Sequence, residues 1–470
     1  ILLLCCMVLT LLPTAAFAAG ELPDVKLSVP TTFDKTVDLT KQNGELKIKD
    51  SKTYLIKGST DPNWYFQHRI KIDGKNNTPH IFLDGVRLQA PKDGPAIELY
   101  GGASACLYFI GRDSELIGAE NFAALQKNKT DGYLRVLVQT GTKLTCEGGR
   151  YGAGIGGSKV GIKNFSQGHG MNLHFGSLAT GIYGGEILAT SGVYGAGIGG
   201  GQGGPGRFIY IKGGTVNAGS ESGGAGIGSG DQDGQNNSED AHHIEISGGT
   251  VEAWSNYAGA GIGGGRGGSG YDISITGGVV RAQGYLGAGI GGGWRGSGSD
   301  ITISGGEVNA TGGVNGAGIG GGCYGYGNNI TVSGDAKLKV QGGVEDNIDG
   351  AGAGIGNGGS SDERAIPVTG AEVEPDTSGL TTAGRIEYYA PGADMENDKP
   401  TSITFGTSSQ PEKPIEPAVP EQPEAERGAD APLYRVTDKD GRDIAYTAEQ
   451  KGGVLTVTVD EDFAVLTSSL

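Results

Sequence analysis

The sequence carries little charge and few aromatic side chains for its 470 residues. Charged residues make up 19% and aromatic residues 7% of the chain, whereas an ordinary domain has about 25% charged residues. The net charge is −17, and acidic residues outnumber Lys and Arg by 53 to 36. Because nucleic acid is bound through basic patches that neutralise phosphates, this balance argues against a nucleic-acid partner.

Cysteine is also scarce. Cys5 and Cys6 fall in the first residues of the chain, so Cys106, Cys146 and Cys323 are the ones left for the folded protein. A structural metal site would need close pairs such as Cys-x-x-Cys, and the sequence has none. A Cys106–Cys146 disulfide is one reading for an exported protein. Free cysteines that fill gaps in an apolar interior are the reading we favour.

Proline is limited to 18 residues, whereas glycine reaches 92, about one residue in five, against a usual frequency of about 7%. Collagen would need glycine at every third position with abundant proline, and is excluded. Disorder would need few β-branched and aromatic residues, yet Ile, Val and Tyr recur at fixed places between the glycines. The glycine therefore belongs to a regular fold.

The chain begins with an apolar run at residues 1–12, followed by Pro-Thr-Ala-Ala-Phe-Ala at 13–18. An apolar stretch of about 7–15 residues that ends in small-x-small is typical of a secretory signal, with cleavage after Ala18. A membrane anchor would need about 20 apolar residues, so we expect no membrane span after cleavage. The run has neither an initiator Met nor a basic start, which indicates that its first residues are missing. We expect a secreted, extracellular protein.

A glycine-rich repeat occupies the middle of the chain. The string Gly-Ala-Gly-Ile-Gly returns at intervals of 28 or 29 residues in its cleanest part, and longer intervals resemble the same unit with an insertion. A fixed period of this size indicates a solenoid. A β-propeller would need four strands in about 40 residues or more, and helical repeats conflict with the glycine content. The isoleucines of the string are Ile155, Ile198, Ile227, Ile262, Ile290, Ile319 and Ile355.

Each repeat unit contains three short stretches in which every second residue is apolar. Three strands separated by glycine-rich corners, all burying the same side, form one coil of a parallel β-helix. Equivalent residues of successive coils then stack about 4.8 Å apart, which places Ile275 between Ile246 and Ile303. In the unit from Tyr271 to Gly293 the inward residues are Ile273, Ile275, Val280, Ala282, Ala288 and Ile290.

The outward positions of these stretches predict two further features. Glu252 and Arg281 follow each other in one column, where an ion pair between coils would form. A solvated charge pair that contributes little to stability is the alternative that we favour. Gly287, Gly289 and Gly291 leave the third stretch without outward side chains, which suggests that something approaches the backbone closely. That neighbour is the chain itself, a partner chain or a flat ligand.

Residues from Leu46 to about Leu125 form short alternating stretches with Gly, Asp and Asn turns, among them TYLIKG at 53–58, IFLDGVRL at 81–88 and GPAI at 94–97. This part resembles the secreted carbohydrate-binding β-helix proteins of anaerobic, largely Gram-positive bacteria. The glycine-rich coils resemble those of Gram-positive surface proteins. The resemblance implies a right-handed parallel β-helix that binds plant or acidic polysaccharide, with calcium in some members.

The loops that follow the repeated string vary most and carry aromatic and arginine side chains. Aromatic faces beside guanidinium groups suit sugar rings, and loops on repeats often form the binding surface. The alternative is that these aromatic residues cap the interior or bury the loops. The carbohydrate-binding residues that we predict on this edge are Arg266, Tyr271, Trp294, Arg295, Tyr324 and Tyr326.

Two groups of acidic residues are candidates for other chemistry. Asp272 and Asp300 take the same place in consecutive coils, about 5 Å apart, a separation found in retaining glycosidases, although turns also favour Asp. The segment 231–240 starts with Asp-x-Asp-Gly, as calcium loops do, but lacks the full EF-hand spacing. A solvated acidic loop is therefore the alternative to a calcium site made by Asp231, Asp233 and Glu239.

The sequence predicts an exported, non-catalytic β-helix that binds polysaccharide or acts as an adhesin at the cell surface. A β-helix polysaccharide lyase or glycoside hydrolase is the first alternative, and a structural spacer without ligand is the second. The sequence indicates no oligomeric state. The expected parts are a signal (1–18), carbohydrate-binding-like coils (24–130), glycine-rich coils (131–360), an end cap (361–409), a Pro/Glu linker (410–432) and a small β module (433–470).

Overall fold

The computed structural model describes residues 28–74, 77–129, 131–161, 168–177, 181–232, 240–361 and 366–407, and the backbone of four strands further on. The expected signal at 1–18 and linker at 410–432 lie outside the described residues. The chain divides into two compact units, Ile1–Pro411 and Glu412–Leu470. In the second unit β36 (Arg435–Thr437) pairs with β39 (Val465–Thr467), and β37 (Tyr446–Lys451) pairs with β38 (Val454–Val459), both antiparallel.

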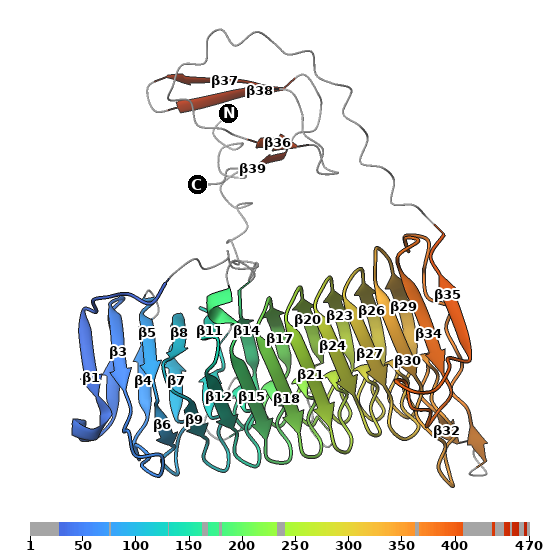
Figure 1. The fold of residues 1–470 in the computed structure, drawn as a ribbon, viewed down its shortest axis with the longest axis horizontal. Helices are drawn as coiled ribbons and strands as arrows, with labels where there is room; N and C mark the ends of the chain where they lie inside the picture. Colours follow the sequence, from blue (N-terminus) through green and yellow to red (C-terminus); the bar gives the residue numbers. More distant parts are fainter. Residues whose placement is uncertain are drawn as a thin grey trace, which may run out of the picture. The chain divides into compact units, whose positions relative to one another are not determined.

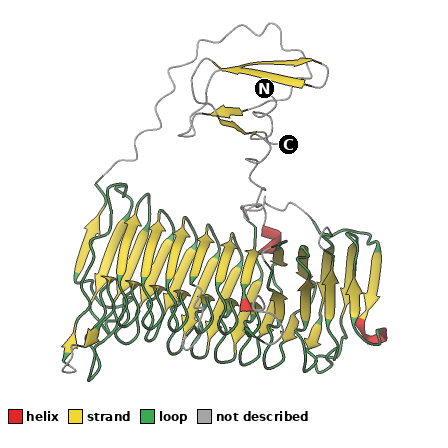
Figure 2. Ribbon diagram, turned by 180° about the vertical axis from the view of Figure 1, so that it is seen from behind, coloured by secondary structure: helices red, strands yellow, loops and turns green. Residues whose placement is uncertain are grey.

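The first unit is a right-handed parallel β-helix, which confirms the predicted fold class (Figure 1). Three sheets of 11 strands each run along it, and each coil from β5 to β31 contributes one strand to every sheet. In sheet A, β11 pairs with β8 before it and with β14 after it, so this sheet continues past the boundary that we expected between the two sets of coils. Figure 2 shows the same coils from behind, with strands and short 3-10 turns. No helix among the described residues is long and apolar enough to cross a membrane.

Sheet A contains β1 (Lys35–Asp38), β3 (Thr53–Lys57), β5 (His80–Asp84), β8 (Ala105–Ile110), β11 (Leu134–Val138), β14 (Gly170–Phe175), β17 (Gly206–Ile211), β20 (Ala241–Ile246), β23 (Gly270–Ile275), β26 (Gly298–Ile303) and β29 (Gly327–Val332). Sheet B contains β2 (Leu46–Ile48), β4 (Ile70–Asp73), β7 (Ile97–Tyr100), β10 (Leu125–Lys127), β13 (Ile155–Gly156), β16 (Ile198–Gly199), β19 (Ile227–Gly228), β22 (Ile262–Gly263), β25 (Ile290–Gly291), β28 (Ile319–Gly320) and β31 (Ile355–Gly356).

Sheet C contains β6 (Arg87–Gln89), β9 (Ser114–Ile117), β12 (Lys143–Glu147), β15 (Glu186–Ser191), β18 (Thr215–Ser220), β21 (Thr250–Ser255), β24 (Val279–Gln283), β27 (Glu307–Thr311), β30 (Lys337–Gln341), β34 (Arg385–Tyr389) and β35 (Ser402–Phe405). The remaining elements of this unit include η1 (Leu39–Lys41), η3 (Gly181–Tyr183) and the short pair β32 (Ser360–Ser361) and β33 (Pro367–Val368).

The core is a set of stacked apolar columns inside the coils. Ile275 pairs in register with Ile246 on one side and Ile303 on the other, as the repeat predicts, and all three side chains are fully buried. Burying an Ile side chain contributes about 1.5–3 kcal/mol. Because every coil repeats these contacts, one continuous core runs the length of the solenoid.

The protein's own backbone fills the glycine face of sheet B. A Cβ atom on Gly289 would lie 2.6 Å from the backbone nitrogen of Thr311 and 2.7 Å from the carbonyl oxygen of Gly318. Gly291 has a φ of +131°, which side chains rarely allow. Of the three neighbours that the sequence leaves open, the chain itself occupies this face.

The three cysteines outside residues 1–18 are free and buried, so no disulfide forms among them. Cys146 packs in the core of the coils. Cys106 instead lies in a second apolar cluster, together with Phe82 and Tyr108, whose rings stack 4.3 Å apart. Cys146 therefore fills space inside the coils, and Cys106 fills space beside the main core. Both fit the gap-filling role that we favoured.

The C-terminal end of the solenoid is capped by its own chain. β34 adds parallel to β30, and β35 then returns antiparallel to β34. Leu380 and Ile386 are fully buried in this cap. Between β34 and β35 the chain passes over the outer face of sheet C, where it meets the side chains of Lys339 and Gln341.

Candidate functional site

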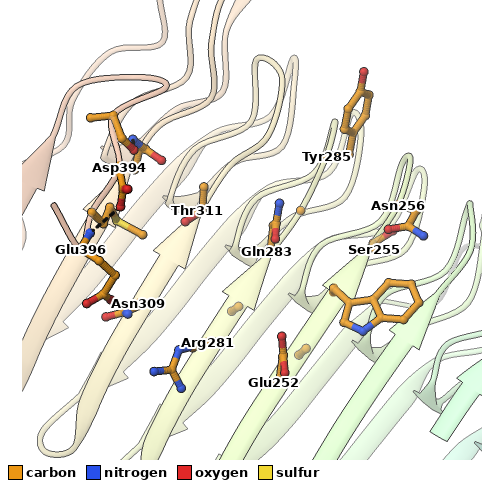
Figure 3. A pocket seen from close by; sticks show the side chains of 17 residues that line it. Glu252, Ser255, Asn256, Arg281, Gln283, Tyr285, Asn309, Thr311, Asp394 and Glu396 are labelled. Carbon is orange, nitrogen blue, oxygen red and sulfur yellow. Dashed lines mark hydrogen bonds between the residues drawn. The ribbon is translucent and has the colours of Figure 1, made fainter. Parts of the chain in front are cut away.

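A groove with a volume of about 550 Å³ lies on the outer face of sheet C. It crosses β21, β24 and β27 and ends at the segment 393–396 (Figure 3). Side chains alternate along a strand, and equivalent residues of successive coils pair in register. Two rows of outward side chains therefore form its floor: Glu252, Arg281 and Asn309 in the first row, and Trp254, Gln283 and Thr311 in the second.

Trp254 is held in place by a glycine of the preceding coil. A Cβ atom on Gly219 would lie 2.1 Å from the Cε2 and Cζ2 atoms of Trp254, so the indole covers the bare backbone there. Trp254 remains half-buried and lines the groove. Glycine in a strand often marks such a close approach.

A second aromatic side chain stands at the rim of the groove. The rings of Tyr285 and Tyr257 stack with centroids 6.5 Å apart, and the two residues are 45% and 49% exposed. Tyr285 lines the groove, and nearly half of the residue is exposed to solvent. Aromatic rings with a polar handle are suited to surfaces that are partly apolar and partly wet.

The polar side chains of the floor make no contacts with one another. Glu252, Arg281, Gln283, Asn309 and Thr311 all belong to the described part of the chain, and their side chains form no hydrogen bond or ion pair within it. Glu252 and Arg281 are in register but form no ion pair, which fits the solvated charge pair that we favoured. Five neighbouring polar groups thus face solvent without an internal partner.

Elsewhere on the same face, outward polar side chains do pair with each other. Lys143 lies 2.9 Å from Glu186, whose Oε1 also accepts a hydrogen bond from Asn217 at 3.4 Å. Further along, Lys337 lies 3.7 Å from Glu307. Glu307 belongs to β27, so it is the two rows of the floor that lack partners and not every outward residue of these coils.

The segment 393–396 carries carboxylates into the end of the groove. Glu396 lies 3.4 Å from the Nζ atom of Lys339. Asp394 accepts a hydrogen bond from the side chain of Asn397 at 2.7 Å and one from the backbone of Glu396 at 2.9 Å. Both hydrogen bonds lower the pKa of Asp394, and the one from the side chain of Asn397 has the larger effect. This carboxylate is therefore ionised at neutral pH.

The structure brings together three of the carbohydrate-binding residues that we predicted. The guanidinium carbons of Arg266 and Arg295 lie 5.3 Å and 4.0 Å from the ring centre of Trp294. Such contacts contribute about 0.5–1 kcal/mol at exposed sites. The ring thus already has two cations of the protein against it, which fits the alternative that these side chains order their own loops.

The other three predicted residues make contacts of their own or remain exposed. Tyr324 donates a hydrogen bond to Asp349 at 2.5 Å. Tyr271 belongs to sheet A and stacks on His242 at 5.0 Å. Tyr326 is 67% exposed and precedes the first residue of β29.

Asp272 and Asp300 lie at a repeated irregularity of sheet A. Their φ angles are +54° and +53°, a left-handed conformation that Asn, Asp and His adopt more readily than other side chains. Asp272 pairs with His243 at 2.8 Å, and Asp300 pairs with Asn329. Each carboxylate thus has a different partner, and backbone geometry accounts for both. The column comprises Asn172, Phe208, His243, Asp272, Asp300 and Asn329.

The candidate calcium residues are only partly described. Asp231 is 2% exposed, and its backbone nitrogen donates a hydrogen bond to the carbonyl oxygen of Tyr194 at 2.8 Å. Asp233 and Glu239 lie outside the described residues. Among the residues that the structure does describe, no group of three His, Cys, Asp or Glu side chains is placed to hold a metal ion.

The sequence predicts the first row of outward side chains but does not predict that they line a groove. Glu252 and Arg281 could be read from the alternation, and the same register would have aligned Trp254 with Gln283 and Thr311. The segment 393–396 carries no repeat signal, so its place on sheet C could not be read from the sequence.

The fold and groove define a parallel β-helix with an open polar cleft on one sheet. The repeats match a family model described as Beta helix repeat, which supports a parallel β-helix family. No match was found among curated proteins or among solved structures. The matched residues are 182–202, 209–231, 244–266, 273–294 and 301–323.

Proposed function

We propose that this protein is an exported, non-catalytic β-helix that binds polysaccharide in the groove on sheet C. The observation that carries the proposal is the run of unpaired polar side chains across three coils, beside Trp254 and Tyr285. A sugar ring offers C–H groups to an aromatic face and hydroxyl groups to amide, hydroxyl, carboxylate and guanidinium side chains. Both kinds of partner are present in this groove.

The groove also favours binding over the two alternatives from the sequence. A glycosidase needs paired carboxylates that act on one bond, and Asp272 and Asp300 already pair with His243 and Asn329. A spacer without ligand has no need of partly exposed aromatic side chains, and two of them, Trp254 and Tyr285, line this groove. The proposal includes export and display at the cell surface, because residues 1–18 have the pattern of a secretory signal.

The proposal is tested with the full chain on an array of neutral and acidic plant and bacterial polysaccharides, followed by calorimetry on the polysaccharides that bind. We expect the double variant Trp254→Ala/Gln283→Ala to lose affinity by about 10-fold or more, since each aromatic or hydrogen-bonding contact contributes about 1 kcal/mol. Thr302→Ala, an exposed outward residue of sheet A, is the matched control.

The outcome that contradicts the proposal is equally specific. Binding that survives the double variant but is lost in Trp294→Ala would move the site to the loop edge. Release of oligosaccharides from a bound polysaccharide would show catalysis and overturn a function limited to binding.

A further inference from the structure

The two rows of the groove run along the axis of the solenoid, so a bound chain follows that axis. Equivalent residues of neighbouring coils are about 4.8 Å apart. Each of the three coils offers one pair of outward side chains, from Glu252 and Trp254 on β21 to Asn309 and Thr311 on β27. The floor therefore has room for about three sugar units, one for each coil.

The same rows continue into β30, but there they are covered. Gln341 follows Thr311 in the second row, and its Nε2 atom donates to the carbonyl oxygens of Ala390 and Ala393, both at 2.7 Å. Lys339 follows Asn309 in the first row, and its Nζ atom donates to the carbonyl oxygen of Met395 at 2.7 Å. We name residues 390–398 the closing segment.

The closing segment is fixed by more than these contacts. Lys339 also lies 3.4 Å from Glu396, and Asp394 accepts hydrogen bonds from the backbone and side chain of Asn397. A Cβ atom on Gly392, which has a φ of +78°, would lie 3.4 Å from the side chain of Val344. The segment therefore forms a wall across the fourth coil (Figure 3).

At the opposite end, the part of the chain that the structure describes contributes no lining residue beyond β21. On β18 the second row continues as Gly219, which has no side chain and is covered by the indole of Trp254. The first row continues as Asn217, which donates a hydrogen bond to Glu186. A chain that leaves the groove on this side passes over the exposed part of Trp254, and no described residue forms a wall there.

From this geometry we infer that the groove binds the end of a polysaccharide chain, with the terminal sugar against the closing segment. This inference rests on the proposed function and narrows its ligand to chain ends. At the wall, Asp394 and Glu396 present carboxylates, which accept hydrogen bonds from the free hydroxyl groups of a terminal sugar. The carboxylates disfavour a terminal sugar that is itself an acid, because like charges repel.

The inference is tested with the full chain and neutral gluco-, xylo- and manno-oligosaccharides, from disaccharide to hexasaccharide, with their parent polymers. We expect affinity to rise up to about the trisaccharide, where all three coils are filled, and then to remain constant. We expect binding capacity to follow the number of chain ends, so that partial hydrolysis of a polymer at constant mass raises it. Oligosaccharides blocked at the reducing or the non-reducing end then identify which terminus is bound.

The double variant Lys339→Ala/Gln341→Ala removes the contacts that hold the closing segment. It is expected to bind unhydrolysed polymer with a capacity that no longer depends on the number of ends. Glu396→Gln is a second variant, whose side-chain oxygen can stay beside Lys339, and it is expected to weaken oligosaccharide binding by about 3- to 10-fold, the effect of about 1 kcal/mol.

Two failures are distinguishable. A protein that binds none of these oligosaccharides or polymers, and no polysaccharide of the array, overturns the proposed function and the inference with it. A protein that binds long polymers in proportion to their total length, whatever the number of ends, overturns the inference and leaves the proposed function intact.

Discussion

At the scale of single residues, the groove depends on a glycine that lies beneath one of its aromatic side chains. Gly219 belongs to β18, and its bare backbone provides the surface on which the Trp254 indole lies. Because a Cβ atom would come within 2.1 Å of that ring, any larger residue must displace the indole. An outward position on a strand thereby decides the orientation of a neighbouring aromatic side chain.

Gly219→Ala is therefore expected to weaken polysaccharide binding by about 10-fold, a loss of about 1.4 kcal/mol, while the fold is kept. The displaced indole should also change tryptophan fluorescence. In Trp254→Ala the same glycine substitution should cost no further affinity, because its effect passes through the ring. Equal losses in both backgrounds would show that Gly219 does not act through Trp254.

A second residue-scale feature is a lysine inside the coils. Lys127 occupies the position of Leu99 in the preceding coil, and only 1% of it is exposed. Burial lowers the pKa of its amino group to about 7, and the amine donates a hydrogen bond to the carbonyl oxygen of Lys129. The folded state therefore prefers the uncharged form.

The unfolded chain keeps this proton up to the ordinary pKa of 10.5, whereas the folded chain releases it above about 7. Between these values the unfolded state binds more protons, so stability rises with pH by about 1.4 kcal/mol per unit. Lys127→Met is expected to stabilise the protein most below pH 7, with the gain fading as the pH approaches 10.5. Urea unfolding across this window measures it, and a gain independent of pH would contradict it.

At the scale of the elements, the repeat string makes a tight corner between sheets. Gly289 stands between Ala288 and Ile290, both fully buried, and its outward side faces the backbone of the next coil. Glycine is required there because Thr311 and Gly318 leave no space for a side chain.

Gly289→Ala is expected to destabilise the protein by about 2–4 kcal/mol, since the added carbon meets backbone atoms that cannot move aside easily. Ser274→Ala, on the outer face of sheet A, serves as the control and should stay within about 0.5 kcal/mol of the original chain. Chemical denaturation compares the two. Equal unfolding midpoints would mean that the corner tolerates a side chain.

The elements also show what the sequence can and cannot predict. The Ile246, Ile275 and Ile303 column follows from alternation alone, because a period of two fixes which residues face inward. The left-handed backbone at Asp272 and Asp300 could not be predicted in this way. In the sequence, an aspartate chosen for its backbone conformation cannot be told from one that acts in catalysis. The closing segment depends on hydrogen bonds to Lys339 and Gln341, which are distant in the chain.

At the scale of the whole β-helix, the backbone of each coil pairs with the next coil. The coils at the two ends lack such a neighbour on one side, so the ends must be closed. At the C-terminal end β34 and β35 fulfil this role and bury Leu380 and Ile386. Exposed sheet edges are templates for pairing with other chains, and solenoids generally need such caps to remain soluble. The same part of the chain supplies the closing segment, so capping and the wall of the groove are linked.

Ile386→Asp is expected to displace the cap, because a carboxylate cannot be buried without a partner at a site that is fully enclosed. The uncovered β30 edge should then produce species larger than those of the original chain, which light scattering after size-exclusion chromatography detects. Ile403→Asp, at a position of β35 that is 42% exposed, is the matched control and should elute as the original chain does. Faster hydrogen exchange at β30 in Ile386→Asp alone would locate the opening, whereas unchanged assembly and exchange would show that β34 and β35 do not protect this edge.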